Sequence, residues 1–403
     1  MEHKPLHGIV VCDFGLHGAG STCGKVLADW GADVIKVEPL WGCPSRGAGA
    51  MLALSVEEDN NPHTELVNSG KRSIAVDMKS PVGREILDRL VAKSHIFFSN
   101  YRLKTLEKFG LDYDTLSARY PHLIWGHLNG YGTEGPLKDA PGFDSASYWS
   151  YGGLFLSPDD RYATLGRAPF GGGDVMAGMS LASGLAACLY RQATTGKGQC
   201  VYTSLYANGC WQNSCTIQAD AAHPGQPPEQ RSNALSCFYR CGDETWFTVT
   251  TMDYAKQGPV YAEMIGRPDL AATLADLDAI MPRNAELTGL LQDFFSRHSW
   301  SEVDGMLNAR DLVHCKVQRP YEVASDPQAL ANGYVYPVTM RGGGQTMVVA
   351  TPVHFGPHHL PEHRLAPLVG EQTREVLLEL GYSEEQIGQM LEQGWIKQTD
   401  TGN

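Results

Sequence analysis

The sequence lacks several features that would assign it to a class at once. Its ten cysteines include no CxxC pair, so neither a zinc site nor a redox motif is indicated. It also lacks a basic excess: 32 Lys and Arg against 45 Asp and Glu give a formal net charge of −13, which argues against nucleic-acid binding. Long hydrophobic runs are missing too. The apolar stretch 175–190 has 16 uncharged residues and falls short of the about 18 that a membrane span needs, so it predicts a core helix.

The N-terminal residues and the histidines exclude two further classes. The apolar stretch near the N-terminus is too short for a signal peptide, and no small-residue cleavage site follows it. We therefore expect a cytoplasmic protein with reduced thiols. The His-rich run 354–363 has no partnered cysteine or carboxylate at ligand spacing and holds two prolines. We expect it to form a surface loop rather than a metal site.

What is present is an alternation of short apolar runs with helical patterns. Helix signals include Ser80-Pro81, a hydroxyl N-cap followed by proline, and a small-residue pattern over 175–192. Strands alternating with helices at this spacing predict an α/β fold with a parallel sheet covered on both faces. The runs that we interpret as strands are 8–13, 33–38, 72–77, 95–99, 123–128 and 200–204.

A first glycine cluster lies between the first predicted strand and helix. Gly18, Gly20 and Gly24 follow a GxGxxxG pattern, and Glu38 ends the second strand 20 residues after Gly18. Backbone N–H groups at such a turn can hold the pyrophosphate of a dinucleotide, with the acidic residue on the ribose. A tight turn with close helix packing explains the same glycines, and both interpretations stay open here.

A second cluster, Gly171–Gly173, stands directly before Asp174 and an apolar helix. Asp174 has a simple structural interpretation as the N-cap of this helix. The three glycines exceed what a cap needs, and they would leave space for a substrate beside the carboxylate. The positive end of the helix dipole would keep Asp174 ionised. An ionised, accessible carboxylate can act as a nucleophile in covalent catalysis.

Taken together, five segments in order resemble the family III CoA-transferases of the CaiB–BaiF type. The resemblance extends from about residue 7 to 396, and its combination of segments is far more specific than any single motif. Within the family, the pattern looks closest to 2-hydroxyacyl and phenyllactate-type enzymes. The resembling segments are 13–47, 68–102, 106–144, 171–199 and 368–391.

The resemblance implies an activity and a mechanism. Enzymes of this family move coenzyme A from an acyl-CoA to a carboxylic acid, here expected to be a 2-hydroxy acid. Asp174 is implied as the catalytic residue, which forms first an acyl-aspartyl anhydride and then an aspartyl-CoA thioester. The CoA thioester is a substrate, and no permanently bound cofactor or metal is expected.

The resemblance also implies which residues surround the substrates. Backbone N–H groups near Asp174 and in the Gly130–Gly132 loop are further candidates to stabilise an oxyanion. Aromatic residues at 148, 149 and 151 either shape an acyl pocket or belong to the core. The implied CoA contacts are His17, Gly18, Ala19, Arg46, Asn100, Arg102 and Lys108, with Lys138 and Phe143 flanking the thioester, and the candidate oxyanion donors are Gly172, Gly173 and Gly132.

The expected architecture is a large Rossmann-like domain built from both chain ends, with a smaller α+β domain between them. The predicted segments are 1–215, 216–325 with its linkers, and 326–403. By resemblance alone we expect an interlocked homodimer that binds acyl-CoA and carboxylic acid substrates, without nucleic acid or membrane as a partner.

Three alternatives remain at this point. An α-methylacyl-CoA racemase shares the fold but uses a His-Asp pair where this chain has Gly142-Phe143-Asp144, and the missing histidine disfavours it. An NAD(P)-dependent oxidoreductase would use the first glycine cluster and Glu38. A CoA-binding protein without catalytic activity is the third.

Overall fold

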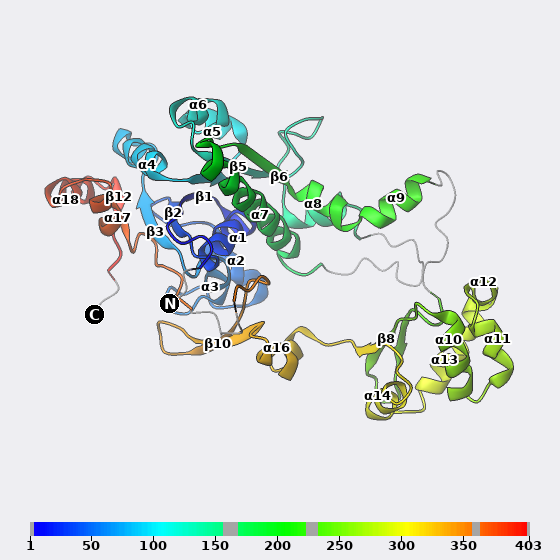
Figure 1. Ribbon diagram of the computed structural model, residues 1–403. Coiled ribbons are helices and arrows are strands. Elements are labelled where there is room, and N and C mark those ends of the chain that lie inside the picture. The colour runs from blue at the N-terminus through cyan, green and yellow to red at the C-terminus, as the bar shows by residue number, and fades with distance from the viewer. Residues whose placement is uncertain (1–3, 156–167, 223–232, 357–362, 401–403) are drawn as a thin grey trace. The chain divides into compact units, whose positions relative to one another are not determined.

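The computed structural model describes residues 4–155, 168–222, 233–356 and 363–400. By its internal contacts the chain divides into two compact units, which are treated separately here (Figure 1). The first unit combines residues 1–155, 165–219 and 324–403, and the second combines 156–164 and 220–323. Part of the predicted linker at 216–233 lies outside the described residues.

A seven-stranded sheet forms the centre of the first unit, in the order β12-β3-β2-β1-β4-β5-β6. All neighbouring strands are parallel except β12, which pairs antiparallel with β3. The parallel sheet predicted from the alternation is thus confirmed, whereas β12 was not predicted because two residues carry no periodicity. The strands are β1 Val10–Phe14, β2 Asp33–Glu38, β3 Arg72–Val76, β4 Ile96–Ser99, β5 Ile124–Asn129, β6 Cys200–Ser204 and β12 Ile396–Lys397.

Helices cover both faces of this sheet, because successive strand residues point to opposite faces. In β1, Val11 belongs to the core shared with α1 and α7, while Cys12 belongs to the core shared with α4 and the C-terminal helices. The helical segments up to β6 are α1 His17–Asp29, α2 Ser45–Ala48, η1 Gly49–Leu52, α3 Pro62–Asn68, α4 Pro81–Lys93, α5 Leu103–Phe109, α6 Tyr113–Arg119, η2 Asp144–Ser150 and α7 Gly172–Thr195.

The C-terminal segment returns to the first unit. Ser383 caps α18: its hydroxyl accepts from Gln386 N at 3.2 Å, and the Gln386 side chain accepts from Ser383 N at 2.8 Å. The predicted cap of α4 is also present, with Ser80 Oγ accepting from Gly83 N at 2.9 Å. The returning elements are α16 Pro327–Ala331, β10 Val335–Thr339, β11 Gln345–Val349, α17 Thr373–Glu379 and α18 Glu384–Glu392.

The second unit has its own core around a three-stranded antiparallel sheet, β7-β8-β9. A hairpin around Gly242 is formed by β7 and β8. Helix α8 Leu205–Gln212 still belongs to the first unit, and α9 Ser214–Ala222 includes the residues at which the division falls. The elements of the second unit are β7 Phe238–Arg240, β8 Trp246–Val249, α10 Tyr254–Met264, η4 Pro268–Leu270, α11 Ala271–Leu274, α12 Leu277–Ile280, η5 Met281–Arg283, α13 Asn284–Phe295, α14 Trp300–Asn308, β9 His314–Lys316 and α15 Pro320–Val323.

Helix α7 is the longest described helix and carries Asp174 in its first turn. By length and composition alone it could cross a membrane. Its buried stripe, which includes Ala177, Leu181 and Leu185, packs into the core with α1 and β5. At Gly178 a side chain would collide with the backbone of α1, because a Cβ there would lie 2.7 Å from Ala19 O. The structure therefore uses α7 as the core helix that the sequence predicts.

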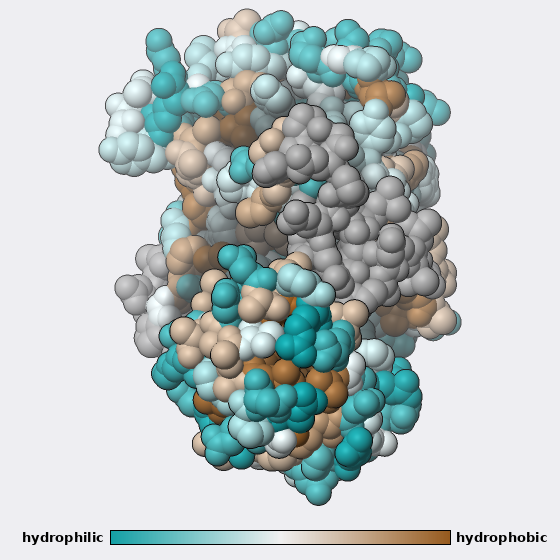
Figure 2. Space-filling view, turned by 90° about the vertical axis from the view of Figure 1, so that its right-hand side faces the viewer, coloured by the Kyte–Doolittle hydropathy of each residue, from teal (hydrophilic) through white to brown (hydrophobic). Residues whose placement is uncertain are grey.

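Large apolar side chains also remain on the surface of the chain. Tyr190, Tyr202 and Trp211 are 77%, 61% and 81% exposed, on α7, β6 and α8. Figure 2 shows apolar patches between hydrophilic residues on the face that it draws. Extensive apolar exposure is typical of a surface that contacts another protein or a ligand.

Candidate active site

Asp174 is not the N-cap of α7, so this structural interpretation of the motif was wrong. The cap position is Gly171, at φ 68°, and Asp174 is the third residue inside the helix. The cap comes instead from Asp144 in η2, whose Oδ1 accepts from Asp174 N at 3.0 Å. Because Asp144 caps the helix, the Asp174 carboxylate is released from that role. Among the described residues it accepts no hydrogen bond, and the residue is half-buried.

The charge state of Asp174 also differs from the expectation that the helix dipole keeps it ionised. Burial, and after it the negative charge of Asp144, together raise its pKa to about 7. A carboxyl group with this pKa is divided between its two forms near neutral pH. Perturbed carboxyl groups of this kind gather at functional sites.

Asp144 is a site residue whose role the sequence reasoning missed: it was named only where a racemase would have its His-Asp pair, and not as a candidate for this site. Burial raises the pKa of Asp144, while the amides of Asp174 and Gly173 act in the opposite direction. The available signal was weak: a lone Asp in a Gly- and Pro-rich stretch carries no periodicity. Only the fold places it beside a helix that begins 28 residues later.

Replacing Asp144 by Asn tests how the two carboxyl groups interact. The amide oxygen can still cap α7, but the like charge is lost, so the pKa of Asp174 should fall. In a plot of kcat/KM against pH, the wild type should lose activity as the pH falls through about 7, and we expect this loss to occur at lower pH in the variant. The control is Asp139→Asn, an exposed carboxylate that pairs with Lys104. Superimposable profiles of wild type and Asp144→Asn would show that the charges do not interact.

The first glycine cluster makes room for polar side chains. A Cβ on Gly18 would collide with the Asp174 carboxylate, its Cγ lying only 3.0 Å away. A Cβ on Gly20 would lie 2.9 Å from Asn100 Oδ1. A Cβ on Gly24 would collide with the Asp13 carboxylate in the same way. The close-packing interpretation of these glycines is therefore correct, and it brings the first turn, α1 and Asp174 together.

Asn100, predicted to contact CoA, holds this turn in place. Its Oδ1 accepts from Leu16 N at 2.6 Å, and its Nδ2 donates to Leu16 O at 2.7 Å. Both side-chain groups are thereby engaged with the backbone directly before His17. Asn100 is thus a positioning residue for the turn.

Glu38 is committed to internal contacts, which removes the basis for dinucleotide binding. Its carboxylate accepts from Arg46 Nε at 2.9 Å and Nη2 at 2.6 Å, from Cys43 N at 2.8 Å and from Ser73 Oγ at 2.7 Å. It is 1% exposed. Although burial acts to raise its pKa, these partners outweigh it and lower the pKa to about 2. No lone pair is left for a ribose hydroxyl, so the oxidoreductase alternative loses its acidic anchor.

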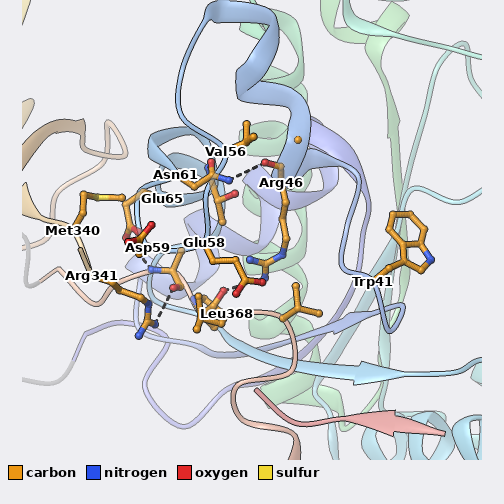
Figure 3. Close-up of a pocket in the computed structure, with 15 residues that line it drawn as sticks. Trp41, Arg46, Val56, Glu58, Asp59, Asn61, Glu65, Met340, Arg341 and Leu368 are labelled. Atoms are coloured by element: carbon orange, nitrogen blue, oxygen red, sulfur yellow. Dashed lines mark hydrogen bonds between the residues drawn. The ribbon is translucent and has the colours of Figure 1, made fainter. Parts of the chain in front are cut away.

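Arg46, predicted to contact CoA, is paired with Glu38 through Nε and Nη2, and its contact with CoA stays a prediction. Besides Glu38, its Nη2 donates to Pro367 O at 3.0 Å. Arg341 binds the neighbouring carbonyl of Ala366 at 3.2 Å, and both arginines line a cavity of about 210 Å³ (Figure 3). Arg46 holds the C-terminal return against the segment after β2, whereas Arg341 links two parts of that return, Ala366 and Glu371 being its partners.

Exposed side chains around the turn remain available to a ligand. His17 is exposed and adopts φ 54°, unusual for a residue with a side chain. Its ring lies 6.4 Å from that of Phe143, which is 62% exposed. Burial and then the charge of Lys36 lower the pKa of His17. Ala19 is 4% exposed, so only its backbone could contact a ligand.

Three predicted basic residues point into solvent. Arg102, which directly precedes α5, and Lys108 within it are exposed, as is Lys138 in the segment after β5. No carboxylate of the described residues pairs with any of the three. They are free to bind phosphate groups.

The predicted oxyanion donors are already used. Gly132 N donates to Asn129 Oδ1 at 2.7 Å, and Gly172 N donates to Pro169 O at 3.2 Å. Gly173 N acts on the Asp144 carboxylate, and a Cβ on Gly173 would collide with Tyr148. This glycine is required for packing, so the assignment of the three glycines as free donors was wrong.

The aromatic residues divide between core and surface. Tyr148 is 1% exposed and belongs to the core of α1 and α7. Tyr151 is 53% exposed, and its ring lies 5.4 Å from Tyr131 and 5.0 Å from Tyr206. Tyr148 is therefore a core residue, while Tyr151 and the half-buried Trp149, whose ring lies beside Gly172, are positioned to face an acyl group.

The described part of the His-rich run agrees with the predicted surface loop, since 354–356 are exposed and form neither helix nor strand, but His363 is more firmly held. His363 Nε2 lies 2.7 Å from Glu65 Oε1, and its Nδ1 lies 3.0 Å from the Tyr336 hydroxyl. It thereby ties β10 to α3. Two histidines of the run, 358 and 359, lie outside the described residues.

Comparison with known proteins points to one family. The sequence profile of CoA-transferase family III matches residues 6–373. A (R)-2-hydroxy-4-methylpentanoate CoA-transferase of Clostridioides difficile is 34% identical over 95% of this chain and 97% of its own. A cinnamoyl-CoA:phenyllactate CoA-transferase of Clostridium sporogenes is 31% identical over 95% of each chain.

Solved structures agree with this result. A CAIB/BAIF family protein from Brucella suis superposes with a TM-score of 0.79 at 26% identity. The match covers 94% of this chain and all of that one. The large parallel sheet with its helices is therefore the CaiB/BaiF fold.

Proposed function

We propose that this chain, which belongs to CoA-transferase family III, transfers coenzyme A from an acyl-CoA to a 2-hydroxy carboxylic acid through Asp174. Its relatives are CoA-transferases, and CoA thioesters are accordingly its substrates. The observation that carries the proposal is the Asp174 carboxylate: it is half-buried, relieved of capping by Asp144 and in contact with Gly18 of the first turn.

The proposed reaction is a sequence of four acyl substitutions. A carboxylate oxygen of Asp174 attacks the thioester carbonyl, and the C–S bond breaks to give an acyl-aspartyl anhydride and CoA thiolate. The thiolate attacks the aspartyl carbonyl, which frees the donor acid and leaves an aspartyl-CoA thioester. The acceptor carboxylate attacks this thioester and displaces the thiolate. The thiolate then attacks the acceptor carbonyl of the new anhydride, which restores Asp174 and releases the product.

The environment of Asp174 suits this chemistry in two ways. A partly desolvated carboxylate with a pKa of about 7 is a stronger nucleophile than an ordinary one, yet a large fraction is ionised at neutral pH. The first amides of α1 also lie beside it at Gly18, and the cap residue Leu16 provides no side chain to satisfy them. Helix geometry leaves such amides without intrahelical partners, so we assign Gly18 and Ala19 as oxyanion donors.

The nucleotide end of CoA supplies binding energy at a distance from the reacting bond. Forming an anhydride from a thioester is uphill, and remote binding can offset that cost. Arg102 and Lys108 are the exposed cations that best suit the phosphates, with Lys138 nearer the thioester. Arg46 is less available than these, because Glu38 and Pro367 already engage its Nε and Nη2.

The proposal that the CoA acceptor is a 2-hydroxy acid rests on the names of the similar proteins. Two of them, at 34% and 31% identity, are named for 2-hydroxy-4-methylpentanoate and for phenyllactate. Two apolar side chains close in sequence to Asp144 and Asp174, Phe143 before Asp144 and Met176 in the first turns of α7, are 62% and 52% exposed and could contact an apolar acyl group. A racemase of this fold finds no support here, since Phe143 stands where its histidine is expected.

The decisive experiment follows CoA and the carboxylate together. The enzyme is incubated with a panel of acyl-CoA donors and 2-hydroxy acids, products are read by mass spectrometry, and an aliquot is quenched with hydroxylamine. We expect acyl exchange and a hydroxamate on the peptide that contains Asp174. Exchange without any adduct on that peptide would contradict the aspartyl route, and binding of CoA without exchange would favour a non-catalytic protein.

The homodimer and the cytoplasmic location stay predictions. Exposed aromatic side chains on α7, β6 and α8 support a contact between copies of the chain. Net charge and thiol content are compatible with a cytoplasmic protein.

A further inference from the structure

Three polar side chains form a buried cluster directly beneath the first turn. The Asp13 carboxylate lies between the ammonium groups of two lysines: Lys71 Nζ lies 2.8 Å from Asp13 Oδ2, and Lys36 Nζ lies 3.8 Å from the same oxygen. All three side chains are fully buried. The sequence does not reveal that Asp13 and the two lysines form a group, because each of the three residues stands in or beside a different strand.

The lysines bind both ends of the turn. Lys36 Nζ donates to Gly15 O at 2.9 Å and to Ser21 Oγ at 3.3 Å. Lys71 Nζ donates to Ser21 O at 2.7 Å and to Asn68 Oδ1 at 3.1 Å. Residues between Gly15 and Ser21 include Gly18, which contacts Asp174. The ammonium groups therefore fix the backbone that faces the proposed nucleophile.

The cluster holds more positive charge than its own stability requires. Removing an ammonium group from water costs several kcal/mol, which a buried carboxylate must offset. Asp13 alone could balance one lysine, and Glu38 is already balanced by Arg46. One positive charge remains, and its field reaches the turn, because the charge of Lys36 acts to lower the pKa of His17.

We infer that Lys36 and Lys71 are positioning residues of the transfer reaction, which hold the first turn against Asp174 and place one uncompensated positive charge beneath it. The inference rests on the proposed function. Anions arise at this turn at each step: the tetrahedral oxyanion, the CoA thiolate and the released carboxylate. A fixed positive charge in a buried site stabilises them without reorganisation.

The test compares the wild type with Lys36→Met and uses Lys25→Met as control. Lys36→Met leaves the Asp13–Lys71 pair balanced, so the variant should fold. Lys25 is also largely buried and pairs one-to-one with Asp29 on the outer part of α1. We expect kcat of Lys36→Met to fall about 10²-fold while KM for acyl-CoA changes little, as for other preorganised electrostatic groups. Lys25→Met should retain kcat.

The pH profile gives a readout that a merely structural role would not move. Burial lowers the pKa of Lys71, and the positive charge of Lys36 acts in the same direction. Asp13 and the buried Cys23 thiol oppose them, and the resulting pKa is about 8. The wild type should therefore lose activity above about pH 8 as Lys71 loses its proton. In Lys36→Met the repulsion is gone, so this alkaline limb should move to higher pH.

A readout without turnover separates this inference from the proposed function. His17 can be titrated by NMR, its signal assigned with His17→Asn, and its pKa should rise in Lys36→Met because the repelling charge is removed. If the wild type transfers no CoA, the proposed function fails whatever this titration shows. Unchanged kcat together with unchanged His17 and alkaline titrations would overturn the inference. If Lys36→Met does not fold, Lys71→Met takes its place, and failure of both to fold would show a role in folding alone.

Discussion

Asp174→Asn should abolish CoA transfer while the protein stays folded. The amide is nearly isosteric with the carboxylate but is not a nucleophile, so neither the anhydride nor the aspartyl thioester can form. We expect kcat to fall by at least about 10⁴-fold, the scale on which single members of a covalent catalytic unit act. The measurement is the rate of acyl exchange between acyl-CoA and a 2-hydroxy acid at pH 8.

The same substitution should increase thermal stability. The pKa of Asp174 is raised to about 7, so its ionised form is disfavoured by the fold. For a carboxyl group with a raised pKa, stability is lost as pH rises from the unfolded value through the folded one. At pH 8 the neutral Asn variant should therefore have a higher Tm than the wild type. Such a gain of stability with a loss of activity is common where a functional site is unfavourable for folding.

Asp114→Asn is the matched control for this prediction. Asp114 is an acidic residue in the first turn of another helix, α6, and is exposed. Its replacement should change neither the transfer rate nor the Tm appreciably. An Asp174→Asn enzyme with ordinary turnover would remove the nucleophile from the mechanism, and with it the central argument for this site.

The sequence was enough to predict those elements of the fold that depend on contacts between residues close together in the chain. Ser80 and Ser383 cap helices within three residues, and most strands of the parallel sheet are largely apolar runs. The residues that cause such structures lie next to each other in the sequence, so the structures can be predicted from it. The two-residue strand β12 has no such pattern and depends on its distant partner β3, whereas the hairpin β10-β11 pairs locally around Gly342–Gly344 and was a usable signal that went unused.

The candidate site was only partly predictable, because its polar contacts join residues far apart in the chain. Asp174 was identified, but the cap provided by Asp144 over 30 residues was not. Arg46 looked like a free cation until the fold paired it with Glu38. Charged residues in buried strands, such as Lys36 in β2, were a usable signal that went unused. A charge in a strand buried on both faces needs a partner, and finding that partner requires the sheet order.

Gly18→Ala should separate folding from function more cleanly than any substitution of a charged residue. Gly18 is in the first turn of α1, where alanine is the better helix former, by up to about 1 kcal/mol in a helix interior. The added Cβ would collide with the Asp174 carboxylate and displace it. A displacement of about 1 Å in a reacting group can cost 10²-fold in rate, so we expect about that loss of kcat/KM with an unchanged or higher Tm.

The control for Gly18→Ala is Gly289→Ala, in α13 of the second unit, where an added Cβ meets nothing within 4 Å. Both variants gain the same methyl group in a helix, so a general effect of the substitution would appear in both. Activity lost only in Gly18→Ala would assign the loss to the contact with Asp174. Equal activity in the two variants would mean that the carboxylate can react from another position, and the close contact across the first turn would then have no part in catalysis.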